Sequence, residues 1–432
     1  MTRSNGRQID YDALVKPDAV HGDCYIDPDI FAEEQKRIFG RGWVYIGHKS
    51  EVPRPGDYIR SWLGLQPVLL THDRDGRHHV LFNRCTHRGA SICQEDKGNA
   101  GGFRCEYHGW FFRNNGDLTS IPYMDGYGEN VDKSQFNLRR PPRVDDYRGF
   151  IFASLSPNGI SLRDHIGGPA MEQIDYACDL SPEGELLVQA GSTKLAYNGN
   201  WKLQMENSID GYHPNFTHQS YFNGIERMIG RKPDIFTGES SVRSRDMGMG
   251  NTNIDMRRYN IEAPGARGRI EMMQKAPWGK KYYDDLVKAH GKERAEELLM
   301  VNGTHMNVFP NLVVLANQVR TIRPLSAERT EVYLRPSLLK GVPDEVNTMR
   351  IRQFESFYSP HGGGIHDDVE MFNRVHEGLK CSYDPWLTFR RGMHREQVEN
   401  DGTLTGQCTD ETAQRGMWRH WKSVMQQEDA NP

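Results

Sequence analysis

Two cysteine–histidine pairs in the first third of the chain limit what that part of the sequence can fold into. Cys85 and His87 form a C-x-H pair, and Cys105 and His108 form a C-x-x-H pair. A glycine follows each pair at the end of an apolar run, so each pair is predicted to lie in a turn after a strand. Two such turns facing each other would present two thiolates and two imidazoles to one centre.

Three interpretations of this group remain open at this point. The first is a coincidence of two loops with buried cysteines. The second is a structural zinc site, because two cysteines and two histidines suit a closed tetrahedral ion. The third is a Rieske-type [2Fe–2S] cluster, in which the cysteines hold one iron and the histidines hold the other. Cys93 lies between the pairs and is interpreted as an ordinary buried thiol.

Composition narrows the class of protein. The chain has 432 residues, seven cysteines and a formal net charge of -4, which fits a globular protein of two or three domains without a disulfide scaffold. It shows no apolar run of about 18 residues, no apolar secretion signal and no block of Lys and Arg. We therefore expect a cytoplasmic protein whose partners are small molecules, with neither nucleic acid nor membrane among them.

The pattern of apolar residues changes along the chain. Residues 28–43 have the pattern of a short amphipathic helix that ends at Gly40, and residues from there to about 155 form short apolar runs typical of a small all-β domain. The remainder mixes strand patterns with helical spacing at 344–358 and 368–379, which predicts an α+β domain. Residues 228–300 are polar and rich in Gly, Arg and Met, and are expected to form loops and helices over the sheet.

A second candidate metal site lies at residues 198–218. His213 and His218 are five residues apart, a spacing that turns the two rings apart on a continuous helix, but Pro214 makes a continuous helix improbable there. A helix that ends near His213 and then bends could bring both rings onto one ion. Two histidines and one carboxylate on one face of Fe(II) form the facial triad of non-haem oxygenases.

These segments carry a resemblance to a known family. "CTHRGA" and "CEYHGW" resemble the Rieske signature of aromatic-ring-hydroxylating oxygenases, and "NWKLQMENSIDGYHPNFTH" resembles the mononuclear-iron motif of their large subunits. The segments "GRGWVYIGHKSEVPRPGDY", "RTIRPLSAERTEV" and "DDVEMF" are similar to the benzoate, toluate and anthranilate dioxygenase branch. Similarity extends over nearly the whole chain.

The resemblance implies a fold and a set of domains. It implies an α+β chain with a small all-β Rieske domain and a catalytic domain whose antiparallel sheet is covered by helices in a helix-grip-like arrangement. The expected division is an N-terminal helical segment at 1–42 that packs on the catalytic domain, a Rieske [2Fe–2S] domain at 43–156 and a mononuclear-iron domain at 157–432.

It also implies ligands. The cluster would be held by Cys85, His87, Cys105 and His108, and the mononuclear Fe(II) by His213, His218 and Asp368. Spacing alone does not choose between Asp368 and its neighbour Asp367, which is the fallback ligand. The glycine run at 362–364 would let the chain turn sharply into this site.

Asp210 lies three residues before His213 and would share a face with it on a helix. Asp210 could be a solvated carboxylate or could simply orient His213. In the family, the matching Asp links the iron-ligand histidine to a Rieske histidine of the neighbouring subunit, which implies a homotrimer or an α3β3 assembly with a small second subunit. Asn207 matches a polar residue near the iron and is given a minor role.

The expected activity is that of a terminal oxygenase subunit. It would use O2 and electrons from NAD(P)H, delivered by a separate reductase with or without a ferredoxin, to cis-dihydroxylate an aromatic substrate such as an aromatic carboxylate. Arg320 and Arg323 are candidates for binding that carboxylate because they lie on a predicted strand, and residues 228–300 would cover the pocket entrance. The alternatives are a Rieske monooxygenase, either a ring hydroxylase or a demethylase, and a zinc-stabilised binding module.

Overall fold

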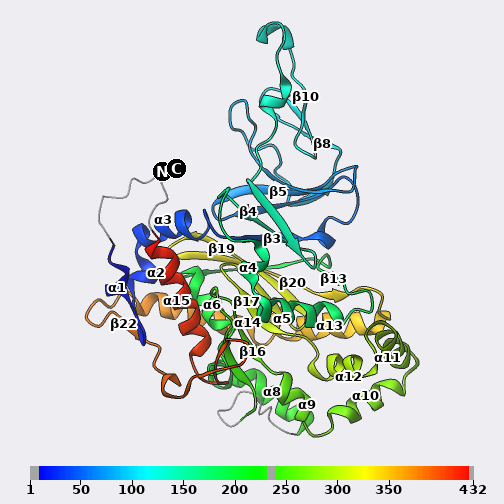
Figure 1. Cartoon of the computed structure of the whole chain (residues 1–432), viewed down its shortest axis with the longest axis vertical. Coiled ribbons are helices and arrows are strands. Elements are labelled where there is room, and N and C mark those ends of the chain that lie inside the picture. The colour runs from blue at the N-terminus through cyan, green and yellow to red at the C-terminus, as the bar shows by residue number, and fades with distance from the viewer. Residues whose placement is uncertain (1–8, 231–239, 428–432) are drawn as a thin grey trace. The chain divides into compact units, whose positions relative to one another are not determined.

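The structure is a computed structural model that describes residues 9–230 and 240–427. Two compact units divide the chain. Phe39–Leu162 form one unit, and the described residues up to Ile38 join those from Arg163 onward in the other (Figure 1).

The unit at 39–162 is built from antiparallel strands in three small sheets. One sheet has the order β6-β5-β4-β7, the second β10-β9-β8 and the third β11-β12-β3. The strands are β3 Val44–His48, β4 Asp57–Leu63, β5 Gln66–His72, β6 His78–Phe82, β7 Lys97–Asn99, β8 Gly102–Arg104, β9 Phe111–Arg113, β10 Leu118–Ser120, β11 Arg143–Tyr147 and β12 Phe150–Ser154. Apart from short 3-10 turns, no helix lies wholly within the unit, so the predicted all-β domain is confirmed.

The second unit contains a nine-stranded antiparallel sheet of order β14-β20-β19-β18-β17-β16-β15-β24-β23. Its strands are β14 Thr193–Asn198, β15 Arg243–Asp246, β16 Thr252–Asp255, β17 His305–Val308, β18 Leu312–Leu315, β19 Gln318–Ser326, β20 Arg329–Pro336, β23 Gln397–Val398 and β24 Leu404–Gln407. All four residues of β18 are buried, because this central strand is covered on both faces.

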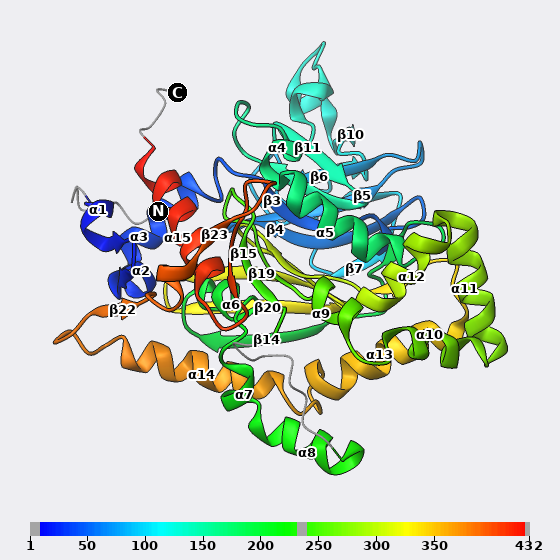
Figure 2. The same ribbon diagram turned by 60° about the horizontal axis from the view of Figure 1, so that its bottom comes forward.

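Helices cover this sheet. The expected helix at 344–358 is α13 Asp344–Tyr358, and the one expected at 368–379 is α14 Ile365–Gly378. Figure 2 shows α13 and α14 following one another along the side of the sheet that carries β14. Phe372 of α14 packs on Tyr197 of β14 with ring centroids 4.6 Å apart, which fixes the face that α14 turns to the sheet. The predicted α+β architecture is confirmed.

Residues 228–300 differ in part from the expectation of loops and helices. They contain α9 Arg257–Glu262, α10 Ala266–Gln274, α11 Pro277–His290 and most of α12 Lys292–Val301, but they also supply β15 and β16 to the sheet. Sequence patterning missed these strands because they are polar. Buried Arg245 of β15 is neutralised by Asp255 at 3.2 Å and Asp401 at 2.8 Å. Residues 231–239 of this region lie outside the described residues.

The two ends of the second unit meet around α6 Trp201–Asn207. Glu34 lies on α3 Pro28–Arg37, and its carboxylate accepts hydrogen bonds from the indole N–H of Trp201 at 2.8 Å and of Trp421 at 2.7 Å. It also forms an ion pair with the ammonium group of Lys202, and both side chains of that pair are fully buried. These three contacts of one carboxylate join helix α3, helix α6 and the C-terminal helix α15 Thr412–Gln426 inside an aromatic core.

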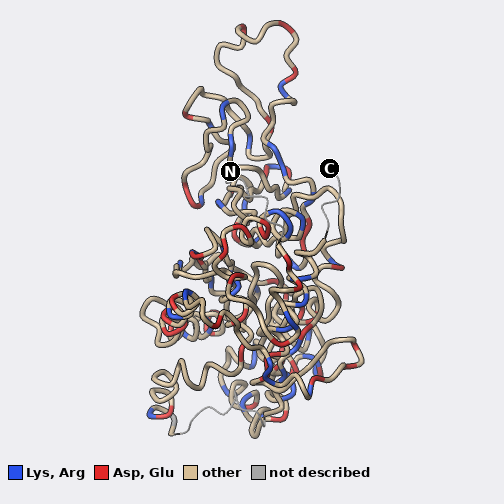
Figure 3. Tube along the Cα trace, turned by 90° about the vertical axis from the view of Figure 1, so that its left-hand side faces the viewer, with Lys and Arg blue, Asp and Glu red and all other residues tan. Residues whose placement is uncertain are grey.

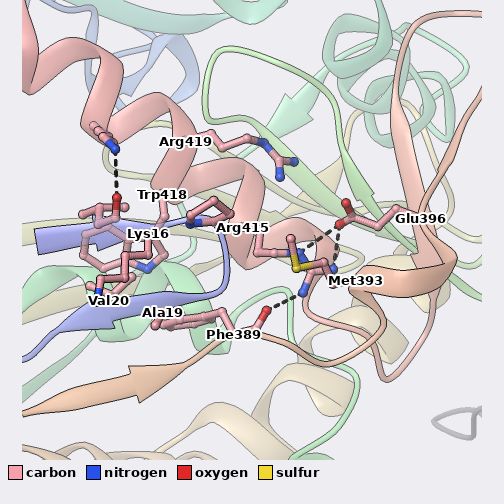
Figure 4. A pocket seen from close by; sticks show the side chains of 12 residues that line it. Lys16, Ala19, Val20, Phe389, Met393, Glu396, Arg415, Trp418 and Arg419 are labelled. Atoms are coloured by element: carbon pink, nitrogen blue, oxygen red, sulfur yellow. Dashed lines mark hydrogen bonds and ion pairs between the residues drawn. The ribbon is translucent and has the colours of Figure 1, made fainter. Parts of the chain in front are cut away.

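A hollow lies where the N-terminal strands β1 Val15–Lys16 and β2 Ala19–His21 approach α15 (Figure 4). Arg415 is one of the residues that line it, and its guanidinium group bonds to Glu396 at 2.6 Å and to the carbonyl of Phe389. The guanidinium group already has these protein partners, so this hollow is a packing feature of the N-terminal segment.

Figure 3 shows that basic and acidic residues are interspersed along the trace. Among the residues described, no helix combines the length and the apolar character needed to cross a membrane.

Candidate metal centres and active-site pocket

The two cysteine–histidine loops of the first unit have the same backbone hydrogen bonds. In each loop the cysteine N–H donates to the carbonyl five residues later, and the glycine N–H four residues later donates back to the cysteine carbonyl. The four bonds are Cys85 to Ala90 at 2.8 Å, Gly89 to Cys85 at 3.0 Å, Cys105 to Trp110 at 2.8 Å and Gly109 to Cys105 at 2.8 Å. Gly89 and Gly109 have φ of 78° and 74°, the left-handed conformation that glycine adopts without strain.

The four side chains of the two loops face one another. Cys85 and Cys105 are buried, and the ring centroids of His87 and His108 lie 4.5 Å apart. His87 is stacked on Trp110, with centroids 4.8 Å apart and planes at 6°. The buried Nδ1 atom of His87 has no hydrogen-bond partner among the described residues, as expected of an atom that would bind a metal.

A single zinc ion fits this group poorly. A tetrahedral site needs four ligand atoms around one point. Among the described residues, one group brings three such ligand atoms within 4.8 Å of one another, and it consists of His213, His218 and Asp368. The cysteines and histidines of the two loops do not gather as closely. The two paired loops therefore fit a two-iron cluster better than a zinc ion. Cys93 is buried beside them, as predicted, with its thiol 3.6 Å from the carbonyl of Glu95.

The second centre lies at the end of α6. The predicted bend is present, but the helix ends earlier than expected, at Asn207, and residues 208–213 form an irregular turn. A four-residue helix, α7 Pro214–Thr217, then separates the two histidines and brings their ring centroids to 5.3 Å. Pro214 occupies the first position of α7, where its missing N–H costs nothing.

Asp368 joins the two histidines from α14. Its Oδ1 atom lies 3.2 Å from Nε2 of His218, 3.5 Å from Nε2 of His213 and 3.0 Å from the side-chain amide nitrogen of Asn207. Asp367 instead lies on the far side of His218, with Oδ2 3.5 Å from Nδ1. The geometry thus puts Asp368 among the ligand atoms and Asp367 behind one of them.

The electrostatics of this group suit a divalent cation. Burial raises the pKa of Asp368, but hydrogen bonding and charge from His218, with smaller contributions from His213 and Arg320, hold that pKa below its usual value. Asp368 is therefore ionised at neutral pH. One carboxylate and two imidazoles directed at the same point fit Fe(II) with positions left open.

Asp210 reaches His213 from the turn rather than from a shared helical face. Its Oδ2 atom lies 3.1 Å from Nδ1 of His213, and its Oδ1 atom accepts the N–H of Tyr212 at 2.7 Å. The second bond closes a local turn, which explains how the side chain holds its place without a helix. Because Nδ1 of His213 faces Asp210, Nε2 is left to face Asp368.

The glycine run before Asp368 provides space rather than an unusual backbone angle. None of the three glycines has a positive φ. A Cβ atom at Gly362 would lie 2.5 Å from the backbone carbonyl of Phe357, and one at Gly364 would lie 2.2 Å from the ring of Phe357. That ring packs against His218 with centroids 4.9 Å apart. The small glycines therefore leave the space in which Phe357 can pack beside this histidine.

A cavity of about 300 Å³ opens over the three converging side chains. Its wall is largely aromatic and aliphatic, with Tyr221, Phe222, Met256, Leu315, Ala316, Phe357 and Tyr358. Sequence reasoning did not single out Tyr358 or the half-buried His305, which also line the cavity. Burial, with the charge of Arg320 acting in the same direction, lowers the pKa of His305 to about 4, so this ring is neutral at pH 7.

The two arginines named as candidates for carboxylate binding have different positions. Arg320 lines the cavity and is 3% exposed. Arg323 is not among the cavity residues, and its guanidinium group is paired with Glu331 at 2.8 Å. The sheet therefore places one of these arginines at the site.

Comparisons with known families agree with both centres. Residues 42–138 match the Rieske [2Fe-2S] domain, and residues 185–427 match the ring-hydroxylating alpha subunit catalytic domain.

Several named proteins are similar over most of their length. The chain is 34% identical to the 2-halobenzoate 1,2-dioxygenase large subunit of Burkholderia cepacia, over 86% of this chain and 79% of the relative. It is 31% identical to the anthranilate 1,2-dioxygenase large subunit of Acinetobacter baylyi, over 86% and 80%. Its fold matches naphthalene 1,2-dioxygenase with indole bound, at a TM-score of 0.80 and 25% identity, over 96% of this chain and 95% of that one.

The paired cysteine–histidine loops, the His–His–Asp group and these matches have one common explanation. The chain belongs to the Rieske-type ring-hydroxylating oxygenases, as a large (alpha) subunit that combines a [2Fe–2S] domain with a mononuclear non-haem iron domain.

Proposed function

We propose that this subunit cis-dihydroxylates an aromatic carboxylate with O2 and with electrons that a separate reductase supplies from NAD(P)H, directly or through a ferredoxin. The observation that carries the proposal is the convergence of His213, His218 and Asp368 beneath a cavity with a largely apolar wall. The size of the cavity, about 300 Å³, is at the lower end for small-molecule sites and suits a single substituted ring.

In this proposal, Cys85, His87, Cys105 and His108 hold the cluster, and His213, His218 and Asp368 hold the Fe(II). When bound, these groups supply one-electron transfer and the activation of O2. The protein contributes position and charge: Asp210 orients His213, Asn207 holds Asp368, and the aromatic wall excludes water from the bound ring. We also interpret residues 43–156 as the cluster domain and 157–432 as the catalytic domain, with residues 1–42 packed on the latter.

Asp210 has a second role in this proposal, as the link between two subunits. Its side chain is 25% exposed although one oxygen contacts His213, so a partner group can reach it. His108 is exposed on its loop, as a histidine that contacts a neighbouring chain would be. A trimer, with or without a small second subunit, would bring the cluster of one chain to the iron of the next.

The decisive experiment is oxygenation under 18O2. Purified protein with a surrogate reductase is supplied with benzoate, other aromatic acids and neutral aromatics, and the products are analysed by mass spectrometry and NMR. Two labelled oxygen atoms in a cis-diol are expected from an acid substrate. One labelled atom would indicate a monooxygenase, and the absence of oxygenated product from every compound would contradict the proposed function.

A further inference from the structure

The wall of the iron-site cavity contains a buried arginine without an acidic partner. Four arginines in the described part of the chain are buried: Arg245, Arg320, Arg350 and Arg415. Arg245 and Arg415 pair with carboxylates, and Arg350 donates to backbone carbonyls and a hydroxyl group. Within those described residues, Arg320 has neither an ion pair nor a hydrogen bond to a carbonyl of the backbone.

The contacts that Arg320 does make orient it. Its Nε–H donates to the side-chain oxygen of Gln318 at 3.1 Å, and its guanidinium carbon lies 5.0 Å from the ring centroid of Tyr358. Strand β19 holds the residue between Val313 of β18 and Leu334 of β20, within the sheet. Gln318 thus occupies the Nε edge, and the hydroxyl group of Tyr358 interacts with the guanidinium group as well. The remaining N–H groups of the planar fork are available to a ligand in the cavity.

The charges around the cavity lead to the same conclusion. Its wall contains two carboxylates, Asp210 and Asp368, which together offset the charge of one Fe(II). His305 is neutral at pH 7, so once an Fe(II) ion balances the two carboxylates, no acidic side chain of the wall remains to balance the guanidinium group of Arg320. A buried charge without a partner is costly, and an anionic ligand would remove that cost.

We propose that Arg320 binds the carboxylate of an aromatic acid and so fixes the position of the ring over the iron site. A guanidinium group matches a carboxylate through two parallel N–H···O bonds, which set orientation as well as affinity. The apolar wall then contacts the ring. This inference rests on the proposed function, and it assigns the recognition of the acid to one residue.

The test compares benzoate with nitrobenzene, which has nearly the same shape and no charge. Binding of each to the oxidised, iron-loaded protein is measured by equilibrium dialysis without an electron donor, so that no turnover occurs. Wild type is expected to bind benzoate more tightly. Arg320→Met should weaken benzoate binding on the order of 10- to 100-fold, the usual effect of losing hydrogen bonds to a charged group, and change nitrobenzene binding little.

Two further variants complete the test. Arg320→Lys keeps the charge without the fork and should recover part of the preference for benzoate, and it replaces Arg320→Met if that protein does not fold. Arg323→Met is the matched control, because it removes a cation from the same strand outside the cavity and should leave both affinities unchanged.

The outcomes separate this inference from the proposed function. Equal binding of benzoate and nitrobenzene by wild type, or equal weakening of both by Arg320→Met, would overturn the role of Arg320 and leave it as a charge that acts on Asp368. Arg320-dependent benzoate binding without any oxygenated product would instead support the binding site and contradict the oxygenase. Oxygenation confined to neutral aromatics would support the oxygenase and overturn the binding site.

Discussion

Asp210 and His213 are joined by a carboxylate–imidazole contact of 3.1 Å made from a turn, with the carboxylate one-quarter exposed. A buried carboxylate would suffice to orient the ring. The exposure leaves this side chain able to contact a second chain, and the two roles predict different behaviour.

Asp210→Asn is expected to keep both metal centres and to block electron transfer between them. After rapid mixing of the reduced variant with benzoate and O2, the cluster should stay reduced while that of wild type is oxidised. Asp367→Asn is the control, because Asp367 contacts the other histidine in the same way, at 3.5 Å from Nδ1 of His218. If Asp210 only orients its histidine, both variants should behave alike, with losses of about 10- to 100-fold in iron affinity or activity.

Asp368→Ala should release the mononuclear iron and leave the cluster spectrum unchanged. The reason is that Asp368 supplies the carboxylate oxygen closest to both Nε2 atoms. Iron per chain, measured by elemental analysis beside acid-labile sulfide, checks this. Should Asp367→Ala lose the iron and Asp368→Ala keep it, the ligand would be the neighbouring residue.

The cluster assignment predicts a brown protein with two sulfides per chain and a Rieske-type paramagnetic signal on reduction. Cys105→Ser should abolish the colour and the signal, since thiolates hold one of the two irons. Cys93→Ser, a change of another buried cysteine in the same unit, should keep both. Tightly bound zinc without sulfide, in protein produced with ample iron, would refute the assignment.

Gly211→Ala should disturb the turn that carries Asp210. The new Cβ atom would lie 2.4 Å from the carbonyl oxygen of Cys408, which is fully buried and cannot move aside. A loss of about 1–3 kcal/mol in the free energy of unfolding is expected, together with weaker iron binding. Gly224→Ala, in the interior of α8 Gln219–Ile229, meets no atom within 4 Å and should stabilise slightly, as measured by urea denaturation.

Lys202→Met should be among the most destabilising single changes in the catalytic unit. It leaves the carboxylate of Glu34 buried without its cation, which typically costs about 3–5 kcal/mol. The double variant Glu34→Gln with Lys202→Met should lose less than the two single variants added together. Additive losses in urea denaturation would show that the pair is not coupled.

The features that could be predicted from the sequence are those whose residues lie close together along the chain. The cluster loops could be predicted because ligand types, spacing and turn glycines lie within 25 residues of one another. Strands β15 and β16 could not be predicted from apolar patterning, because Arg245 is neutralised by Asp401, more than 150 residues away.

The choice between Asp367 and Asp368 required the orientation of α14, which depends on a distant contact. Phe372 packs on Tyr197, and Asp368 lies four residues before Phe372, on the same face of the helix. The spacing of Asp368 and Phe372 is visible in the sequence, but the contact of Phe372 with Tyr197, which fixes the face of α14 that meets the sheet, is not. The turn that carries Asp210 could not be predicted from the sequence, because its next residue, Gly211, packs against the distant Cys408.

The contact that joins Glu34 to α6 and α15 sets an order of events during synthesis. The ribosome delivers Glu34 first, Lys202 much later and Trp421 later still, so the carboxylate of Glu34 stays in water until α15 has emerged. The unit at 39–162 is continuous and can fold while the rest is being made. Nascent chains stalled before α15 should therefore acquire the iron–sulfur domain and still lack a finished catalytic one.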